Sequence, residues 1–123
     1  RFINSGITPV VAPLTHDGMG NILNTNADTM ASTVAKALAD KFEVTLIFSF
    51  EKKGVLSNPD DDDSVIPLIT REIFKMYEEN GVISGGMKPK VENALSAVEK
   101  GVSRVVITLA DNIGKSDEGT VIQ

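Results

Sequence analysis

Residues 87–109 decide the fold, and they read Met-Lys-Pro-Lys-Val-Glu-Asn-Ala-Leu-Ser-Ala-Val-Glu-Lys-Gly-Val-Ser-Arg-Val-Val-Ile-Thr-Leu. Helical spacing places five apolar side chains on one stripe of residues 87–98: Met87, Val91, Ala94, Leu95 and Val98. Gly101 is placed to end this helix, and residues 105–109 form a β-branched run typical of a buried strand. A helix followed directly by a buried strand is the repeating unit of an α/β fold.

Apolar stretches elsewhere in the chain predict further strands. Residues 44–50 (Val-Thr-Leu-Ile-Phe-Ser-Phe) are β-branched and aromatic, and residues 7–14 contain the apolar run Val-Val-Ala. Both are expected to be buried strands, and residues 120–122 are expected to form a short last strand. Strands that alternate with helices imply right-handed crossovers and a mainly parallel sheet covered on both sides. The predicted fold class is therefore α/β, a three-layer αβα sandwich.

Helices and turns are predicted from their end signals. A helix is expected from Ala27 to near Asp40, with Asn26 as its N-cap, and another over residues 69–79. Residues 17–18 (Asp-Gly) suit a tight hairpin turn. Residues 1–6 resemble the end of a helix capped by glycine, so the chain is expected to be part of a longer protein.

Composition excludes several classes of function. A chain of 123 residues with 41% hydrophobic residues is expected to form one domain. A net charge of −5 argues against broad binding to nucleic acid or to an anionic membrane. With no Cys and a single His, thiol chemistry and Cys-ligated zinc are excluded and a cytoplasmic location is expected. No apolar run approaches the roughly 20 residues that cross a bilayer.

Two clusters of residues could carry chemistry. Gly85 and Gly86 precede the helix of residues 87–98, where backbone N–H groups and the helix dipole suit a phosphate, and Lys90 lies in its first turn. Asn24 and Asp28 flank the predicted start of the helix at Ala27. Each has a plainer reading: the glycines shape a loop, the lysine is solvated, Asn24 forms a turn and Asp28 complements the helix dipole.

The remaining charged residues favour no dedicated site. Residues 60–63 are four consecutive aspartates, which predict an exposed, self-repelling loop. Consecutive side chains cannot all face one ion, so a metal site is not favoured there. His16 is expected to be an exposed loop histidine.

Two motifs together resemble those of a known family. Residues 24–28 (Asn-Thr-Asn-Ala-Asp) resemble the N-x-N-A-D motif of acetylglutamate kinases, and residues 83–90 (Ile-Ser-Gly-Gly-Met-Lys-Pro-Lys) resemble their I-S-G-G-M-x-P-K motif. The two motifs are spaced as in that family, and further similarity covers nearly the whole chain. The family belongs to the amino acid kinase fold, and residues 1–123 resemble its carboxyl-terminal, ATP-binding lobe as a single domain of a longer kinase.

This resemblance implies a reaction and a set of site residues. ATP, with the Mg²⁺ that it carries, would phosphorylate the side-chain carboxylate of N-acetyl-L-glutamate or a related N-acyl-glutamate in arginine biosynthesis. The acceptor would reach the site through the missing amino-terminal lobe, and the parent is expected to be a homo-oligomer. Lys90 would stabilise the transferring phosphoryl group, Asp28 would orient the catalytic lysines and Asn24 would bind the acyl-amino acid. The implied nucleotide-binding residues are Glu51, Lys52, Lys53, Gly54, Val55, Leu56, Val82, Ile83, Ser84, Gly85 and Gly86.

Alternatives stay open at this point. Glu51, Lys52 and Lys53 stand where the family usually has an aspartate followed by an apolar residue, which favours a non-catalytic module that binds a nucleotide or a protein partner. An enzyme of the same fold with another substrate, such as a glutamate 5-kinase or a uridylate kinase, is a further alternative. The sequence does not decide between an acetyl and a succinyl group on the acceptor.

Overall fold

The centre of the molecule is a mixed four-stranded sheet. The computed structural model describes residues 1–115 and 117–123. In the order of the sheet, the strands are β3 (Thr45–Phe50), β5 (Arg104–Leu109), β6 (Thr120–Ile122) and β4 (Leu68–Ile69). β3 pairs with β5 in parallel over six residues, β4 pairs with β6 in parallel, and β5 and β6 are antiparallel.

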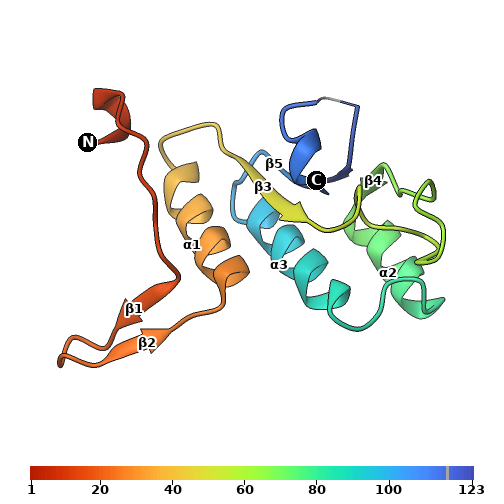
Figure 1. Cartoon of the computed structure of the whole chain (residues 1–123), viewed down its shortest axis with the longest axis horizontal. Helices are drawn as coiled ribbons and strands as arrows, with labels where there is room; N and C mark the ends of the chain where they lie inside the picture. Colours follow the sequence, from red (N-terminus) through yellow and green to blue (C-terminus); the bar gives the residue numbers. More distant parts are fainter. Residues whose placement is uncertain (116) are drawn as a thin grey trace.

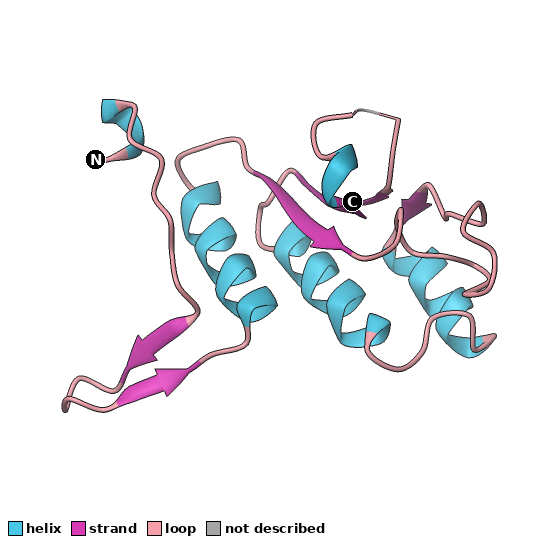
Figure 2. Ribbon diagram, in the orientation of Figure 1, coloured by secondary structure: helices cyan, strands magenta, loops and turns pink. Residues whose placement is uncertain are grey.

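Three helices lie side by side against one face of this sheet (Figures 1 and 2). They are α1 (Ala27–Ala39), α2 (Arg71–Glu79) and α3 (Met87–Glu99). α3 is central, since it contacts α1, α2, β5 and β6, whereas α1 contacts β3 and α2 contacts β4. On the opposite face, the 3-10 turn η2 (Ala110–Asn112) follows β5. The α/β class and the mainly parallel sheet are thereby confirmed.

The core forms where the apolar stripe of α3 meets the sheet. Val91, Ala94 and Leu95 of the predicted stripe are buried, as are Val105 and Ile107 of β5. Burying each side chain of this size stabilises the fold by about 1.5–3 kcal/mol, less for alanine. The helix and strand that the sequence of residues 87–109 predicts are thus the packing centre of the domain.

Local signals at the ends of the elements are also confirmed. The Asn26 side chain caps α1 by accepting a hydrogen bond from the backbone N–H of Thr29 at 3.1 Å. β1 (Leu14–His16) and β2 (Ile22–Asn24) form the predicted hairpin. In its turn, the Asn21 side chain and the N–H of Met19 hold the pKa of the Asp17 carboxyl below its usual value.

The amino-terminal end agrees with its prediction only in part. η1 (Ile3–Ser5) is a 3-10 turn, and Gly6 caps it in a left-handed conformation. The predicted glycine cap is therefore present, but the element before it is a single 3-10 turn.

Within the described part of the chain, the helices are too short or too polar to cross a membrane.

The buried strand predicted at residues 7–14 is wrong. Residues 7–13 have no regular structure and are exposed, with Val10 at 96% exposure, and only Leu14 enters β1. They run beside α1 and away from the sheet (Figure 1), leaving β3 as the edge strand. Pro9 and Pro13 lack the N–H groups that a sheet ladder needs, and an apolar run alone does not show which surface covers it.

Three details of the sheet also differ from the predictions. β3 was expected to be buried, but it is an edge strand and its Ile47 is 39% exposed. β4 is a two-residue strand that the sequence does not signal. Ile69, the predicted first residue of the helix, belongs to this strand, and α2 begins only at Arg71. β6 runs antiparallel to β5, and the described part of the segment between them contains the 3-10 turn η2 rather than a crossover helix.

One buried hydroxyl ties the turn after β3 to β6. The Oγ1 atom of Thr120 accepts a hydrogen bond from the N–H of Val55 at 2.8 Å and donates one to the carbonyl of Ile66 at 2.7 Å. A Cβ placed on Gly54 would lie 2.7 Å from this Oγ1, so close packing requires glycine there. The turn that follows β3 is therefore fixed to the core rather than left as a free loop.

Thr120→Val should destabilise the chain because it removes this hydroxyl and leaves a buried N–H and a buried C=O without their partner. We expect a loss of about 2 kcal/mol in the free energy of unfolding, measured by urea denaturation. Thr120→Ser keeps the hydroxyl and removes one methyl group, so its loss should be about 1 kcal/mol or less. Equal losses in the free energy of unfolding for the two variants would show that the Thr120 hydroxyl does not hold the turn to β6.

Candidate functional site

The starts of α1 and α3 meet at the edge of the sheet where β3 ends. In a parallel α/β arrangement, helices run back against the strands, so their amino ends lie beside the carboxyl ends of the strands. Asp28 in the first turn of α1 and Lys90 in the first turn of α3 are joined there, with 2.6 Å between Lys90 Nζ and Asp28 Oδ2. Two residues 62 positions apart in sequence thus form one ion pair.

The Lys90 ammonium is held from two sides. Its side chain is only 16% exposed, and Nζ lies 4.9 Å from the centre of the Phe48 ring. Phe48 is itself buried, so the ring is a fixed support for the cation. An ammonium has three donors, and Asp28 accepts one, so Lys90 keeps the capacity to bind an anion at this edge.

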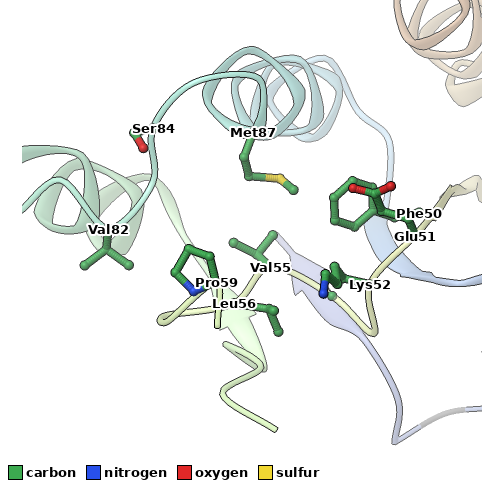
Figure 3. Close-up of a pocket in the computed structure, with 10 residues that line it drawn as sticks. Phe50, Glu51, Lys52, Val55, Leu56, Pro59, Val82, Ser84 and Met87 are labelled. Carbon is green, nitrogen blue, oxygen red and sulfur yellow. The ribbon is translucent and has the colours of Figure 1, made fainter. Parts of the chain in front are cut away.

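A cavity of about 220 Å³ opens at the start of α3, where Ser84 and Met87 line it (Figure 3). It lies between the end of β3, the fixed turn after it and the start of α3, with Met87 pointing in from the helix. Its walls are mostly apolar, and Glu51, Lys52 and Ser84 add polar groups. The lining residues are Phe50, Glu51, Lys52, Gly54, Val55, Leu56, Pro59, Val82, Ser84 and Met87.

The start of α3 is built unlike the starts of the other two helices. Asn26 caps α1 and Thr70 caps α2, whereas among the described residues no side chain caps α3, whose N-cap is Gly86. Its first turn has no acidic residue and contains Lys88 and Lys90. Cations at the positive end of a helix are unfavourable, and Asp28 and Glu78 offset part of this cost by pairing with Lys90 and Lys88.

The two glycines before α3 differ in whether the local structure requires glycine. Gly85 has φ of +56°, a left-handed conformation that side chains rarely adopt. Gly86 has an ordinary φ of −67°, and no described atom beyond its chain neighbours lies within 4 Å of a Cβ placed on it. Packing inside the chain therefore does not require glycine at position 86, and the space above it is open to a ligand.

Most of the residues proposed for a nucleotide gather around the cavity, and a few lie apart from it. Seven of them line it: Glu51, Lys52, Gly54, Val55, Leu56, Val82 and Ser84. Ile83 is buried in the core, and Lys53 pairs with Asp63 outside this cavity. Asn24 is exposed at the end of β2, two residues before the cap of α1.

Sequence reasoning missed the aromatic and apolar contributors. Phe48 beneath Lys90 was assigned only to a strand, although alternation along residues 44–50 could have placed it on the helix-facing side. Phe50 and Met87 could have been found because each directly adjoins a predicted site segment. Within the described residues, no cluster of three or more carboxylate, imidazole or thiol side chains is placed to hold a metal ion.

Comparisons with known proteins agree on one family. The model of the amino acid kinase family matches residues 1–109. Acetylglutamate kinase of Phocaeicola vulgatus is 61% identical over 122 residues, which cover 99% of this chain and 47% of that protein. Acetylglutamate kinase of Bacteroides thetaiotaomicron is 60% identical with the same coverage. The chain thus spans about half the length of the curated relatives it matches.

Solved structures share the fold. A crystal structure of smu.665 from Streptococcus mutans UA159 superposes with a TM-score of 0.79 and 36% identity, covering 99% of this chain and 45% of that one. An N-acetylglutamate synthase from Neisseria gonorrhoeae, solved with coenzyme A and L-arginine, has a TM-score of 0.81. At 23% identity over 98% of this chain and 28% of that one, the second likeness concerns the fold alone.

A double-mutant cycle should detect the coupling between α1 and α3. Lys90→Met and Asp28→Asn should each lower the free energy of unfolding, and together they should lose about 1 kcal/mol less than the sum of the single losses, because the pair is partly buried. Lys88→Met and Glu78→Gln, which break the more exposed pair between α3 and α2, form the matched control and should show a smaller coupling. Strictly additive losses at Lys90 and Asp28 would contradict the pairing.

Proposed function

Because the chain belongs to the amino acid kinase family, we propose that it is the ATP-binding lobe of an acetylglutamate kinase. The reaction would transfer the γ-phosphoryl group of Mg-ATP to the side-chain carboxylate of N-acetyl-L-glutamate or a related N-acyl-glutamate, in arginine biosynthesis. The relatives that are about 60% identical support this proposal. Residues 1–123 would form one domain, and the remaining half of the kinase would complete the site.

The cavity beside α3 is proposed to hold the nucleotide. Its mostly apolar walls and its few polar groups suit a flat heterocyclic ring with a polar edge. The uncapped start of α3 lies next to it, so the phosphates of the same nucleotide would reach free backbone N–H groups there. One ligand would thus fill the cavity and bind the uncapped start of the helix.

Lys90 is proposed to stabilise the transferring phosphoryl group. In phosphoryl transfer the protein supplies positioning and charge rather than a covalent nucleophile. Lys90 is preorganised for this role, since Asp28 fixes its ammonium by a 2.6 Å contact and Phe48 supports it from below. Asp28 would act through Lys90, as a positioning residue.

The acceptor is proposed to bind on the side of α1. Asn24 would hold the N-acyl-glutamate from the end of β2, close in sequence to Asp28, and the rest of the kinase would close the acceptor site. The Asn24 side chain is exposed and makes no hydrogen bond to another described residue, so its amide can bind a ligand. We also propose that the full-length kinase is a homo-oligomer.

One observation carries the nucleotide assignment: open space and an uncapped helix start occur together at Gly86. Gly86→Ala should therefore change the free energy of unfolding of the 123-residue chain by no more than about 0.5 kcal/mol, since the new methyl group meets no described atom. It should weaken the binding of Mg-ATP, measured by calorimetric titration of the 123-residue chain, roughly 10-fold through obstruction of the phosphates. The nucleotide assignment would be contradicted if Gly86→Ala left the affinity for Mg-ATP unchanged, or if the folded 123-residue chain without the substitution did not bind Mg-ATP.

Catalysis can be tested in the full-length kinase that contains this chain. Lys90→Ala should lower kcat for phosphorylation of N-acetylglutamate by roughly 10²-fold or more, as for other lost electrostatic stabilisers. An unchanged kcat would instead favour a non-catalytic regulatory module. Phosphorylation of free glutamate rather than N-acylated glutamate would favour another substrate in the same fold.

A further inference from the structure

Two lysines in the turn after β3 are bound by the aspartate run of residues 60–63. Lys52 Nζ lies 2.9 Å from Asp62 Oδ1, and Lys53 Nζ lies 2.9 Å from Asp63 Oδ1. The run was predicted to be a self-repelling exposed loop. It is exposed, but two of its four carboxylates are aimed at two specific ammonium groups.

The loop is built to present these carboxylates. Its ends are joined by a backbone hydrogen bond of 2.9 Å from the N–H of Ser57 to the carbonyl of Ser64. Inside it, the Ser64 hydroxyl donates to the carbonyl of Asp61 at 2.7 Å and accepts from the N–H of Asn58 at 3.0 Å. The loop therefore has a shape of its own, which does not depend on the two ion pairs.

One of the four paired side chains, Lys52, belongs to the proposed nucleotide cavity. Lys52 and Glu51 line that cavity and also a neighbouring one of about 160 Å³, to which Lys53, Asp62 and Leu109 contribute. Pro59, from the same loop, lines the nucleotide cavity. A ligand that extends out of the nucleotide cavity past Lys52 would meet the two lysines and the two aspartates.

We propose that Lys52 and Lys53 form a polyphosphate-binding pair, and that Asp62 and Asp63 occupy it in the free chain as an internal competitor. A magnesium-chelated polyphosphate would displace the two carboxylates on binding. The inference rests on the proposed function for its natural ligand, Mg-ATP, but the pair itself can be tested with an inorganic anion.

The chemistry of the four side chains favours exchange. Ion pairs as exposed as these contribute little to stability, so opening them costs little. Phosphate oxygens offer the same charge-assisted hydrogen bonds and carry more charge than a carboxylate. In the free chain, the hydrogen bonds that Lys52 and Lys53 donate to Asp62 and Asp63 raise the pKa values of both ammonium groups. Glu51 repels a bare polyanion, which favours the magnesium complex.

The aspartate run supplies its own matched control. Asp62→Asn with Asp63→Asn removes the two carboxylates that pair with the lysines, whereas Asp60→Asn with Asp61→Asn removes the same charge from two that do not. Asn at position 61 keeps the oxygen that accepts the N–H of Asp63. Each variant of the 123-residue chain is titrated calorimetrically with magnesium tripolyphosphate, after circular dichroism has confirmed that it is folded.

We expect the 62/63 variant to bind tripolyphosphate roughly 3- to 10-fold more tightly than the 60/61 variant, because removing a closed competitor raises the binding-competent fraction. Adding Lys52→Gln and Lys53→Gln should abolish this difference. Equal affinities of the two aspartate variants, or no binding by either, would overturn the inference.

Titration of the same variants with Mg-ATP distinguishes a failure of this inference from a failure of the proposed function. If tripolyphosphate shows the difference and no variant binds Mg-ATP, the anion pair stands and the nucleotide assignment falls. If both aspartate variants bind Mg-ATP with the same affinity, the nucleotide assignment stands and the internal competitor is refuted.

Discussion

The parallel pairing of β3 with β5 is the constraint on which the rest of the structure depends. Its six-residue register places Phe48 opposite Ile107 and fixes both strand ends at one edge of the sheet. Because α1 leads into β3 and α3 leads into β5, the same pairing sets the two helices beside each other with their first turns at that edge. The contact of Asp28 with Lys90 follows from this topology, since neither residue is near the other in sequence.

The turn after β3 shows how the core shapes the site. Thr120 is completely buried and bonds to both Val55 and Ile66, so a strand at the far end of the chain holds the wall of the cavity. Gly54 is needed there because the chain passes too close to Thr120 for a side chain. Gly86, in contrast, has room for one, so the absence of a side chain there has no explanation within the chain's own packing. Packing therefore requires glycine at position 54 and leaves position 86 open to a side chain.

Much of the fold could be predicted because its signals are local. Asn26 predicts the start of α1. The apolar stripe of α3, together with the β-branched run of residues 105–109, predicts the packing centre. The predicted strand at residues 7–14 failed because burial depends on a partner surface that the residues themselves do not specify. The site was predicted largely by motif resemblance, which named Lys90 and Asp28, whereas Phe48 and the partners of Lys52 and Lys53 depend on tertiary contacts between distant segments.

Charge around the site is balanced residue by residue. Lys90 has Asp28, Lys88 has Glu78, Lys52 has Asp62 and Lys53 has Asp63, so four cations near one cavity each have a carboxylate partner. In a chain of net charge −5, this arrangement keeps the lysines in place without creating a strongly positive surface. An anion gains binding energy here only if its shape lets it replace those carboxylates or use the donors they leave free. Such a site would select by geometry. At the start of α3, whose first turn holds no carboxylate, an anion would meet backbone N–H groups without a side-chain cap.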